Sequence, residues 1–271
     1  MEVKNVNPVA IIQARMGSTR LPGKVLMPIL GKPMLWHIVK RVSYAKELGG
    51  IVVATSDAPE DEAIRRFCID EGIQVFAGSR DDVLDRIYRA ASLYRADPIL
   101  RITGDCPLVD PELVRSLLRL YESNSFDHVG IATGAGAVFM KGGRFPDGLD
   151  AECFSFPALE RAWREATDPR DREHVTSYIW RQPKAFRLGV LESVEDYSRM
   201  RWTVDNAEDF ELISRIYEAL YVAERPFLMR DVLKYFDEHP ELAELNREFI
   251  GKEGYKELWK IPGLNELKKE P

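Results

Sequence analysis

Short runs of β-branched residues alternate with amphipathic helical patterns from Val9 to Leu220. This alternation is typical of a mostly parallel sheet covered by helices on both faces, because each strand-to-strand crossover carries a helix onto one face. The sequence therefore predicts a three-layer α/β fold. The strands are expected at 9–13, 51–55, 74–76, 99–103 and 128–132, and the helices at 34–46, 59–71, 82–94 and 111–122.

The alternation is interrupted after Ala132. Residues 133–150 are rich in glycine and end in R-F-P-D-G-L-D, which predicts a mobile loop or a β-excursion near a site. Helices at 157–166 and 172–181, strands at 186–191 and 201–204, and a helix at 207–220 are expected next. From Arg225 the pattern becomes one of short helices broken by proline and glycine. We therefore expect a domain over 1–224 and a helical extension over 225–271 that packs on it or forms an oligomer contact.

Composition excludes several classes of protein. The 44 acidic and 38 basic side chains give a net charge of −6, which argues against a nucleic-acid or membrane-surface binder. No apolar run reaches the roughly twenty residues of a membrane span, and the amino terminus lacks the apolar segment of a signal peptide. Cys68, Cys106 and Cys153 are too widely spaced to suggest a metal pair or a disulfide framework. A cytoplasmic location is expected.

A basic loop follows the first predicted strand, in the stretch I-I-Q-A-R-M-G-S-T-R-L-P-G-K-V-L. Arg15, Arg20 and Lys24 supply positive charge, and Gly17 and Gly23 allow backbone N–H groups to approach phosphate oxygens. These features favour a site for a nucleoside triphosphate over an ordinary surface loop. The loop is not a Walker A motif, since five residues separate its glycines and valine follows its lysine.

Two aspartates follow predicted strands and are candidate metal ligands. Asp105 comes after the strand at 99–103, and Asp205 after the strand at 201–204. Ligands of open parallel sheets bind at the carboxyl ends of the strands, and two carboxylates facing phosphate oxygens suit Mg²⁺. The alternatives are a turn residue for Asp105 and a helix N-cap for Asp205. Residues 134–139, G-A-G-A-V-F, imitate a dinucleotide fingerprint but lack its third glycine.

Further motifs have the same order as in a known family. They are T-G-D-C-P at 103–107, P-D-G-L-D-A-E at 146–152, R-E-H-V-T at 172–176, V-D-N-A-E-D at 204–209 and H-P-E-L-A-E-L-N at 239–246. Together with a loop of the form A-R-x-G-S-x-R-x-x-x-K, they make the chain resemble the cytidylyltransferases that activate acidic sugars, most closely the type of spore coat polysaccharide biosynthesis protein F. The resemblance implies a nucleotide-diphospho-sugar transferase-like fold, a homodimer and a role in surface polysaccharide biosynthesis.

The resemblance also implies a reaction and its residues. An acceptor oxygen attacks the α-phosphorus of CTP, pyrophosphate leaves, and Mg²⁺ stabilises the charge on the phosphates. Arg15, Lys24 and Asp105 are the expected catalytic residues, and Asp105 and Asp205 the metal ligands. The nucleotide is expected to contact Gln13, Ala14, Arg15, Gly17, Ser18, Arg20, Lys24, Arg80, Asp82 and Thr103. The acceptor, a small acidic sugar or a phosphorylated metabolite, is expected to contact Asp147, Asp150, Glu152, Arg172 and His174.

Several alternatives remain open at this point. Arg80 and Asp82 also fit an ordinary helix start, and the expected acceptor residues also fit a loop before a charged helix. The family commonly has Gln where this chain has Thr103 and often Pro in place of Gln13, which leaves base and acceptor identity open. Another nucleoside triphosphate or a phosphorylated acceptor is therefore an alternative. A glycosyltransferase of similar fold is less favoured, because T-G-D-C-P lacks its D-x-D pair, and the intact loop with both aspartates argues against a non-catalytic nucleotide sensor.

Overall fold

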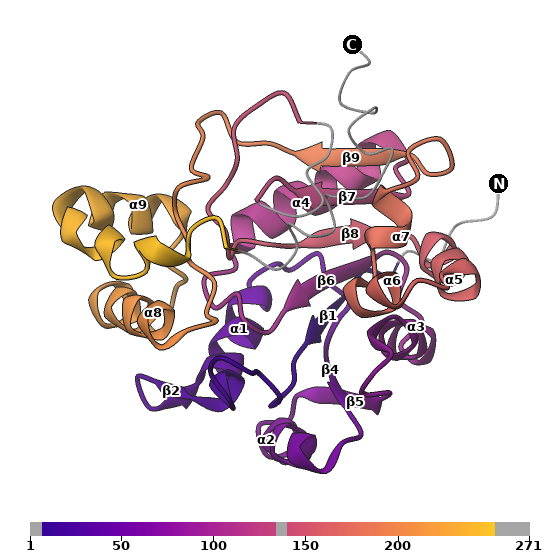
Figure 1. Cartoon of the computed structure of the whole chain (residues 1–271), viewed down its shortest axis with the longest axis horizontal. Coiled ribbons are helices and arrows are strands. Elements are labelled where there is room, and N and C mark those ends of the chain that lie inside the picture. Colours follow the sequence, from indigo (N-terminus) through magenta and orange to yellow (C-terminus); the bar gives the residue numbers. More distant parts are fainter. Residues whose placement is uncertain (1–6, 134–139, 253–271) are drawn as a thin grey trace.

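The computed structural model describes residues 7–133 and 140–252. A seven-stranded sheet forms its centre, in the order β5-β4-β1-β6-β8-β7-β9 (Figure 1). Among the described residues, β8 is the one strand of this sheet that is antiparallel to its neighbours. The strands are β1 (Val9–Gln13), β4 (Gly50–Ser56), β5 (Gln74–Gly78), β6 (Ile99–Thr103), β7 (His128–Ile131), β8 (Glu152–Phe154) and β9 (Leu188–Leu191). A small hairpin, β2 (Pro28–Ile29) and β3 (Lys32–Pro33), lies outside the sheet.

Helices cover both faces of the sheet, so the predicted three-layer α/β architecture is confirmed. Ala10 and Ile12 of β1 belong to one buried cluster and Val9 and Ile11 to the other, which explains why this strand is apolar without alternation. The first face carries α1 (Met34–Val42), α2 (Glu62–Asp70), α4 (Pro111–Asn124) and α8 (Ala207–Leu220). The second carries α3 (Val83–Leu93), α5 (Phe156–Glu165) and α7 (Ser177–Trp180).

Capping side chains begin several of these helices where the sequence predicts them. The Asp110 carboxylate accepts hydrogen bonds from the backbone N–H groups of Glu112 and Leu113, at 2.7 and 3.3 Å. Pro111 occupies the first turn of α4, where a missing N–H costs nothing. Helix α8 starts from a capping box formed by Asn206 and Asp209.

The strand predicted at 201–204 is wrong. Arg201 makes one isolated bridge with Asp147, and the Val204 N–H donates to the Asp105 carbonyl at 2.8 Å. The segment is buried, with Trp202 fully enclosed, so its apolar pattern resembles that of a strand. Its backbone nevertheless bonds to loops, because no neighbouring strand of the described sheet runs beside it.

Two other elements differ from the prediction. Strand β8 was not predicted, because its three residues are too few for a period of two to appear. The helix predicted at 172–181 is two short helices, α6 (Pro169–His174) and α7, which are separated at Val175, where φ is +64°. A β-branched residue in this region of φ is strained, so the continuous pattern is interrupted there.

The carboxyl-terminal part contains the expected short helices over the range that is described. They are α9 (Met229–Glu238) and the 3₁₀ helices η3 (Pro240–Glu244) and η4 (Arg247–Phe249). Figure 1 shows α8 and α9 at one side of the molecule and α3, α5 and α6 at the other. Arg41 of α1 connects the extension to the sheet domain, since its guanidinium donates to the carbonyls of Val109 and Phe227 at 2.8 and 2.9 Å.

Several expectations fall partly outside the described residues. The G-A-G-A-V-F segment at 134–139, inside the expected loop, and the last part of the extension from 253 are among them. The three cysteines are buried and free, as their spacing predicts. Within the described part of the chain, no helix combines the length and apolar character needed to span a bilayer.

Candidate active site

The carboxyl ends of β1 and β6 lie side by side and position two loops. Gln13 is in register with Thr103, and the Gly104 N–H donates to the Gln13 carbonyl at 2.7 Å. A Cβ atom at Gly104 would lie 2.8 Å from that same carbonyl oxygen, so only glycine allows this approach. The basic loop after β1 and the T-G-D-C-P turn after β6 therefore face the same space.

Two adjoining cavities, of about 390 and 230 Å³, open at this edge of the sheet. They share the side of the site formed by Gln13, Arg15, Arg20, Thr103, Asp105 and Asp205. The smaller cavity, which we call the loop cavity, is completed by Ala14, Gly17, Ser18, Thr19, Lys24, Val25 and Gly104. The larger one, the sheet cavity, is completed by Arg101, Cys106, Ile131, Asp147, Asp150, Ala151, Glu152, Glu173, His174, Thr176, Trp180, Arg201 and Thr203.

Lys24 connects the basic loop to both predicted metal ligands. It lies in the 3₁₀ helix η1 (Lys24–Leu26), and its Nζ contacts Asp205 Oδ1 at 2.9 Å and Asp105 Oδ2 at 3.3 Å. The Val204 carbonyl accepts a third hydrogen bond from Nζ at 2.6 Å. Burial favours the neutral amine, but the two carboxylates outweigh it and raise the pKa of Lys24. Its positive charge is therefore fixed between the two aspartates.

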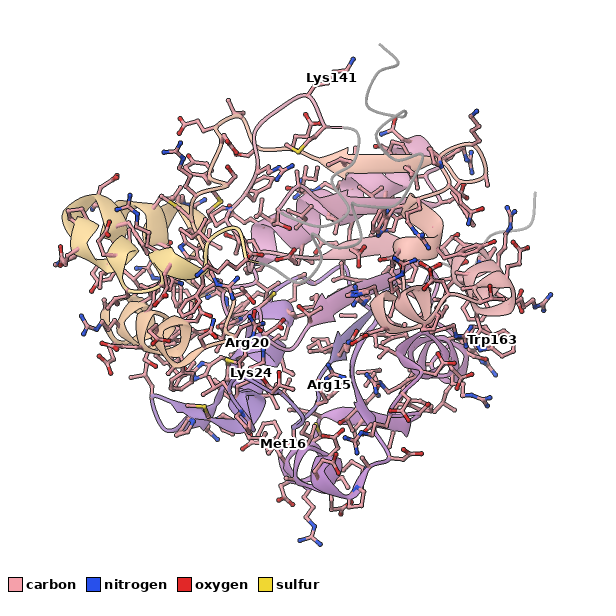
Figure 2. The ribbon with its side chains drawn as sticks, viewed as in Figure 1. Arg15, Met16, Arg20, Lys24, Lys141 and Trp163 are labelled. Carbon is pink, nitrogen blue, oxygen red and sulfur yellow. The ribbon has the colours of Figure 1, made fainter. Side chains whose placement is uncertain are left out.

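The remaining cations of the basic loop are more exposed. Figure 2 labels Arg15, Arg20 and Lys24 near one another in the middle of the molecule. Half of the Arg15 side chain is accessible, and its ion pair with Glu173 is long at 3.8 Å. Arg20 pairs with Asp205 at 2.9 Å. Both guanidinium groups line the loop cavity and are half accessible.

The two glycines of the loop have different roles. Gly23 has a φ of +72° and its N–H donates to the Met16 carbonyl at 3.0 Å, so it forms the turn into η1 and its N–H is already used. Gly17 is exposed, and a Cβ there would have no atom within 4 Å. The backbone of Gly17 is therefore open to close approach by a ligand atom. The sequence predicted such an approach at both glycines.

A buried carboxylate outside the cavities holds the start of this loop. Asp61, the last residue of the 3₁₀ helix η2 (Pro59–Asp61), accepts the Met16 N–H on Oδ1 at 2.6 Å. Its Oδ2 accepts from the N–H and hydroxyl of Ser56, at the end of β4. The side chain is 2% exposed. Asp61 thus ties the loop to the neighbouring strand.

Asp205 is held by cations and does not cap a helix. Arg201 Nη2 contacts Asp205 Oδ2 at 2.8 Å, in addition to the contacts from Lys24 and Arg20. Burial favours the protonated acid, but these cations, Lys24 first, outweigh it and lower the pKa of Asp205. The N-cap of α8 is Asn206. The carboxylate therefore stays ionised at the junction of the two cavities.

Glu152 forms the floor of the sheet cavity with three partners. It accepts from Arg101 Nη1 at 2.5 Å, Thr176 Oγ1 at 2.6 Å and His128 Nε2 at 3.0 Å. Burial by itself raises the pKa of Glu152, but the His128 hydrogen bond and the Arg101 charge lower it to about 2. Arg101 also donates to the Gln13 side-chain oxygen at 3.0 Å. These bonds fix the position of Glu152 in the sheet cavity.

Asp147 and Asp150 also line the sheet cavity. Arg201 Nη1 donates to Asp147 Oδ2 at 3.0 Å. Asp150 accepts from the Thr133 hydroxyl and, at 2.8 Å, from the Gly148 N–H. Burial raises the pKa of Asp150. The P-D-G-L-D-A-E motif thus supplies three carboxylates to one cavity.

Three predicted site residues lie away from both cavities. Arg172 donates to Asp82 through Nη2 at 2.5 Å and through Nε at 3.0 Å, and its Nη1 bonds the Trp163 carbonyl at 2.7 Å. Asp82 caps α3 by accepting the Asp85 N–H at 2.9 Å. Arg80 is exposed and pairs with Glu60 at 3.0 Å. These contacts are those of a helix start and of packing between α3 and α6.

The other predicted residues meet at the cavities. His174, from the same motif as Arg172, lines the sheet cavity, and burial lowers its pKa. The residues that come together are Gln13, Ala14, Arg15, Gly17, Ser18, Arg20, Lys24, Thr103, Asp105, Asp147, Asp150, Glu152, His174 and Asp205. Their assignment to nucleotide, acceptor or metal stays a prediction.

Sequence reasoning missed three charged residues that organise the site. Arg101 interrupts an otherwise apolar strand, I-L-R-I-T, and a charge inside a buried strand was a signal that could have identified it. Arg201 and Asp61 follow no such pattern. Their importance comes from contacts with residues distant in sequence.

The donor groups of the site suit a hard cation that also binds phosphate. Among the described residues, no three histidine, cysteine, aspartate or glutamate side chains are grouped to hold a metal. Asp105 and Asp205 both line the shared side of the two cavities. One or two carboxylates together with phosphate oxygens and water are the usual ligands of Mg²⁺. The residues present therefore fit this ion.

This mostly parallel sheet, with a basic loop and carboxylates at its edge, has a nucleotide-diphospho-sugar transferase-like fold. The family model for cytidylyltransferases matches residues 9–242. The chain belongs to the cytidylyltransferase family, and it is an enzyme of that class, as the resemblance implied.

Known relatives support this assignment. An uncharacterized protein of Methanocaldococcus jannaschii, MJ1063, is 35% identical, over 92% of this chain and 98% of its own length. The spore coat polysaccharide biosynthesis protein SpsF of Bacillus subtilis is 34% identical, over 86% of this chain and 95% of its own. An 8-amino-3,8-dideoxy-manno-octulosonate cytidylyltransferase of Shewanella sp. strain W3-18-1 is 40% identical over a shorter range, 43% of this chain and 48% of that protein.

A solved structure supports the fold over most of the chain. A cytidylyltransferase from Leptospira borgpetersenii serovar Hardjo-bovis superposes with a TM-score of 0.79 at 28% identity. The match covers 88% of this chain and 97% of the other. The fold is therefore shared nearly from end to end.

Proposed function

We propose that this chain transfers the CMP group of CTP to a hydroxyl of a small acidic sugar and releases pyrophosphate. The reaction depends on Mg²⁺ and supplies a CMP-linked sugar for surface polysaccharide. The observation that carries the proposal is the Lys24 ammonium, fixed between Asp105 and Asp205 where the two cavities meet. Such a charge suits the phosphates of a triphosphate whose α-phosphorus lies at this junction.

The two cavities suggest a division of the site. In the loop cavity, Arg15, Arg20 and Lys24 bind and orient the triphosphate, and Lys24 stabilises the negative charge that builds up as pyrophosphate leaves. Mg²⁺, held by Asp105 and Asp205, supplies further charge stabilisation when bound. Asp147, Asp150, Glu152 and His174 line the sheet cavity and orient the acceptor. The acceptor oxygen then attacks the α-phosphorus from the side opposite the pyrophosphate leaving group, as in-line displacement requires.

The proposed class of acceptor and the proposed role in surface polysaccharide synthesis are based on the relatives. The Shewanella protein is named for an octulosonate sugar acid, and the Bacillus protein for spore coat polysaccharide. Three buried cysteines, none of them in a disulfide, fit the reducing cytoplasm. A homodimer is proposed from the resemblance, and sedimentation equilibrium tests it.

Pyrophosphate release tests the proposed reaction directly. The protein with Mg²⁺ is incubated with each common ribonucleoside triphosphate and, in turn, with 3-deoxy-manno-octulosonate, its 8-amino-3,8-dideoxy analogue and glucose 1-phosphate. We expect release with CTP and a sugar acid. Release with another nucleotide, or only with the sugar phosphate, would replace the proposed substrate, and no release from any pair would reject the reaction.

Asp105→Asn tests the metal assignment. The amide keeps the shape of the side chain but removes the charge that a hard cation prefers. Activity should fall sharply, and a titration with Mg²⁺ or Mn²⁺ should restore only part of it. An unchanged metal requirement with normal turnover would remove Asp105 from the metal site.

A further inference from the structure

Asp150 differs from the other carboxylates of the sheet cavity in its partners. Each of the others forms an ion pair within 4 Å: Asp105 with Lys24, Asp147 with Arg201, Glu152 with Arg101, Glu173 with Arg15, and Asp205 with Lys24, Arg20 and Arg201. Asp150 has no such ion pair with any residue in the described ranges 7–133 and 140–252. It is the carboxylate of this cavity whose negative charge is not neutralised by a contacting cation.

Neutral donors hold Asp150 in a defined position. The Thr133 hydroxyl donates to Oδ1, and the Gly148 N–H donates to Oδ2 at 2.8 Å. The Cys106 thiol lies 3.9 Å from Asp150 Oδ2 and 3.7 Å from Asp105 Oδ1. One sulfur atom thus contacts both carboxylates. Asp150 is therefore oriented, and the Cys106 thiol connects it to Asp105.

We propose that Asp150 accepts the proton of the acceptor hydroxyl when that oxygen attacks the α-phosphorus. The inference rests on the proposed function and adds the group that activates the acceptor. The O–H bond breaks and its proton goes to an Asp150 carboxylate oxygen, while the oxygen forms a bond to the α-phosphorus. The bond from the α-phosphorus to the bridging oxygen breaks, and its electron pair leaves on pyrophosphate. Asp150 then releases the proton to solvent.

The surroundings of Asp150 suit this role. A carboxylate paired with arginine or lysine binds a proton weakly, whereas burial raises the pKa of Asp150 and the Thr133 hydrogen bond only partly opposes it. The charges of Asp105 and Glu152 act in the same direction as burial. The titratable groups that act on Asp150 are Cys106, whose sulfur lies 3.9 Å away, and Asp105 and Glu152 through their charges. A base with a raised proton affinity accepts a hydroxyl proton more readily.

The test compares Asp150→Asn with the wild-type chain, using CTP, Mg²⁺ and the sugar acids of the panel above. General-base catalysis contributes typically about 10²- to 10⁴-fold. We therefore expect kcat to fall by about that factor and the acidic limb of the kcat/KM pH profile to disappear. The dissociation constant for CTP, measured by calorimetric titration without acceptor, should stay within about twofold, because Asp150 does not line the loop cavity.

Thr133→Val distinguishes a titrating base from a structural side chain. It removes a hydrogen bond that lowers the Asp150 pKa, so the acidic limb should move to higher pH while turnover persists above it. Asp70→Asn, at an exposed position at the end of α2, is the matched control and should leave the profile unchanged.

Each remaining result overturns the assignment. A raised acceptor KM with normal kcat in Asp150→Asn would make Asp150 a hydroxyl-binding residue. A shifted Mg²⁺ requirement would make it a metal ligand, and a normal pH profile would remove it from catalysis. Absence of pyrophosphate release by the wild-type chain with every acceptor would instead reject the proposed function, and this inference with it.

Discussion

At the scale of single residues, Lys24 is buried although its motif predicts an exposed side chain. Its place in a glycine-containing loop suggests an exposed side chain, yet it is 7% exposed and makes three hydrogen bonds. The charge therefore serves two purposes. It lines the loop cavity, where we propose that it acts on the phosphates, and it separates two carboxylates that would otherwise repel each other.

Lys24→Ala should therefore affect both activity and stability. Removing one charge that stabilises the transition state lowers turnover by about 10²-fold or more. Without the ammonium group, the negative charges of Asp105 and Asp205 are no longer balanced by it and repel each other more strongly. The free energy of unfolding should therefore decrease. Pyrophosphate release and urea denaturation measure the two effects. Lys46→Ala, which removes an exposed lysine bonded to the Ser43 carbonyl, is the control; near-normal turnover in Lys24→Ala would contradict the assignment of the loop.

Glu152 gives the site a dependence of stability on pH. Its folded-state pKa of about 2 lies below its ordinary value of 4.5. The stabilisation is therefore fully present above about pH 4.5 and is lost as the pH falls toward 2. At 1.36 kcal/mol per pKa unit it amounts to about 3 kcal/mol. Glu152→Gln should be less stable than the wild type at pH 7, and the difference should shrink steadily in urea denaturation at pH 5, 4 and 3.

The control for this experiment is Glu218→Gln, at an exposed position of α8. It should not reproduce the pH-dependent difference. If the deficit of Glu152→Gln stayed constant from pH 7 to pH 3, the His128 hydrogen bond and the Arg101 charge would not be the source of the stability.

At the scale of elements, the sequence correctly predicted the strands and helices whose form depends on residues close together in the chain. β1 and β6 are apolar runs that end in polar turns, and α4 and α8 begin at recognisable caps. The failures concern elements whose form depends on distant partners. The segment at 201–204 is buried like a strand but bonds to the turn at Asp105, and β8 is a strand only because β6 and β7 lie on either side of it.

The tie between η2 and the basic loop can be tested by changing Asp61. Asp61→Ala removes the acceptor of the Met16 N–H, so the loop loses an anchor and the KM for CTP should rise about tenfold, as expected for one hydrogen bond to a charged group. Asp61→Asn keeps an oxygen that can accept this bond and should have a smaller effect. Ser56→Ala is the control, because it removes another partner of Asp61 and leaves the bond to Met16 intact.

Steady-state kinetics with varied CTP, together with thermal unfolding, separates anchoring from general damage. If Asp61→Ala and Ser56→Ala raise the KM equally, or if only the melting temperature changes, Asp61 stabilises the fold without positioning the loop.

At the scale of the whole molecule, the site is assembled from segments that are far apart in the chain. Asp105, Asp150 and Asp205 come from three different connections. Because β8 runs antiparallel to β6, the P-D-G-L-D-A-E segment that leads into β8 lies at the edge where β1 and β6 end. The sequence placed 14 of the 17 predicted site residues at the cavities, because strand ends converge in any open parallel sheet. The other three, Arg80, Asp82 and Arg172, lie away from the cavities, and nothing local in the sequence shows that Asp82 and Arg172 pair with each other.

The carboxyl-terminal extension is connected to this assembly through a buried network. Asn246, 2% exposed, donates to the Arg201 carbonyl at 2.9 Å and to Asp209 Oδ1 at 2.8 Å. Asp209 in turn bonds Arg201 Nε at 3.0 Å, and Arg201 holds Asp205. The extension is thus linked by consecutive hydrogen bonds to a residue of the active-site cavity. On this basis we expect it to unfold together with the sheet domain.

Asn246→Ala tests this connection. Removing the amide leaves buried acceptors without their donor, at a cost of about 1–3 kcal/mol in the free energy of unfolding. Far-UV circular dichroism and tryptophan fluorescence should still report one coincident urea transition, shifted to lower denaturant, because the network joins the extension to the core. Arg247→Ala, next in sequence but on an exposed pair with Glu244, should leave the transition in place. Two separate transitions in the wild-type chain would show that the extension is an independent unit and that it does not stabilise the position of Asp205.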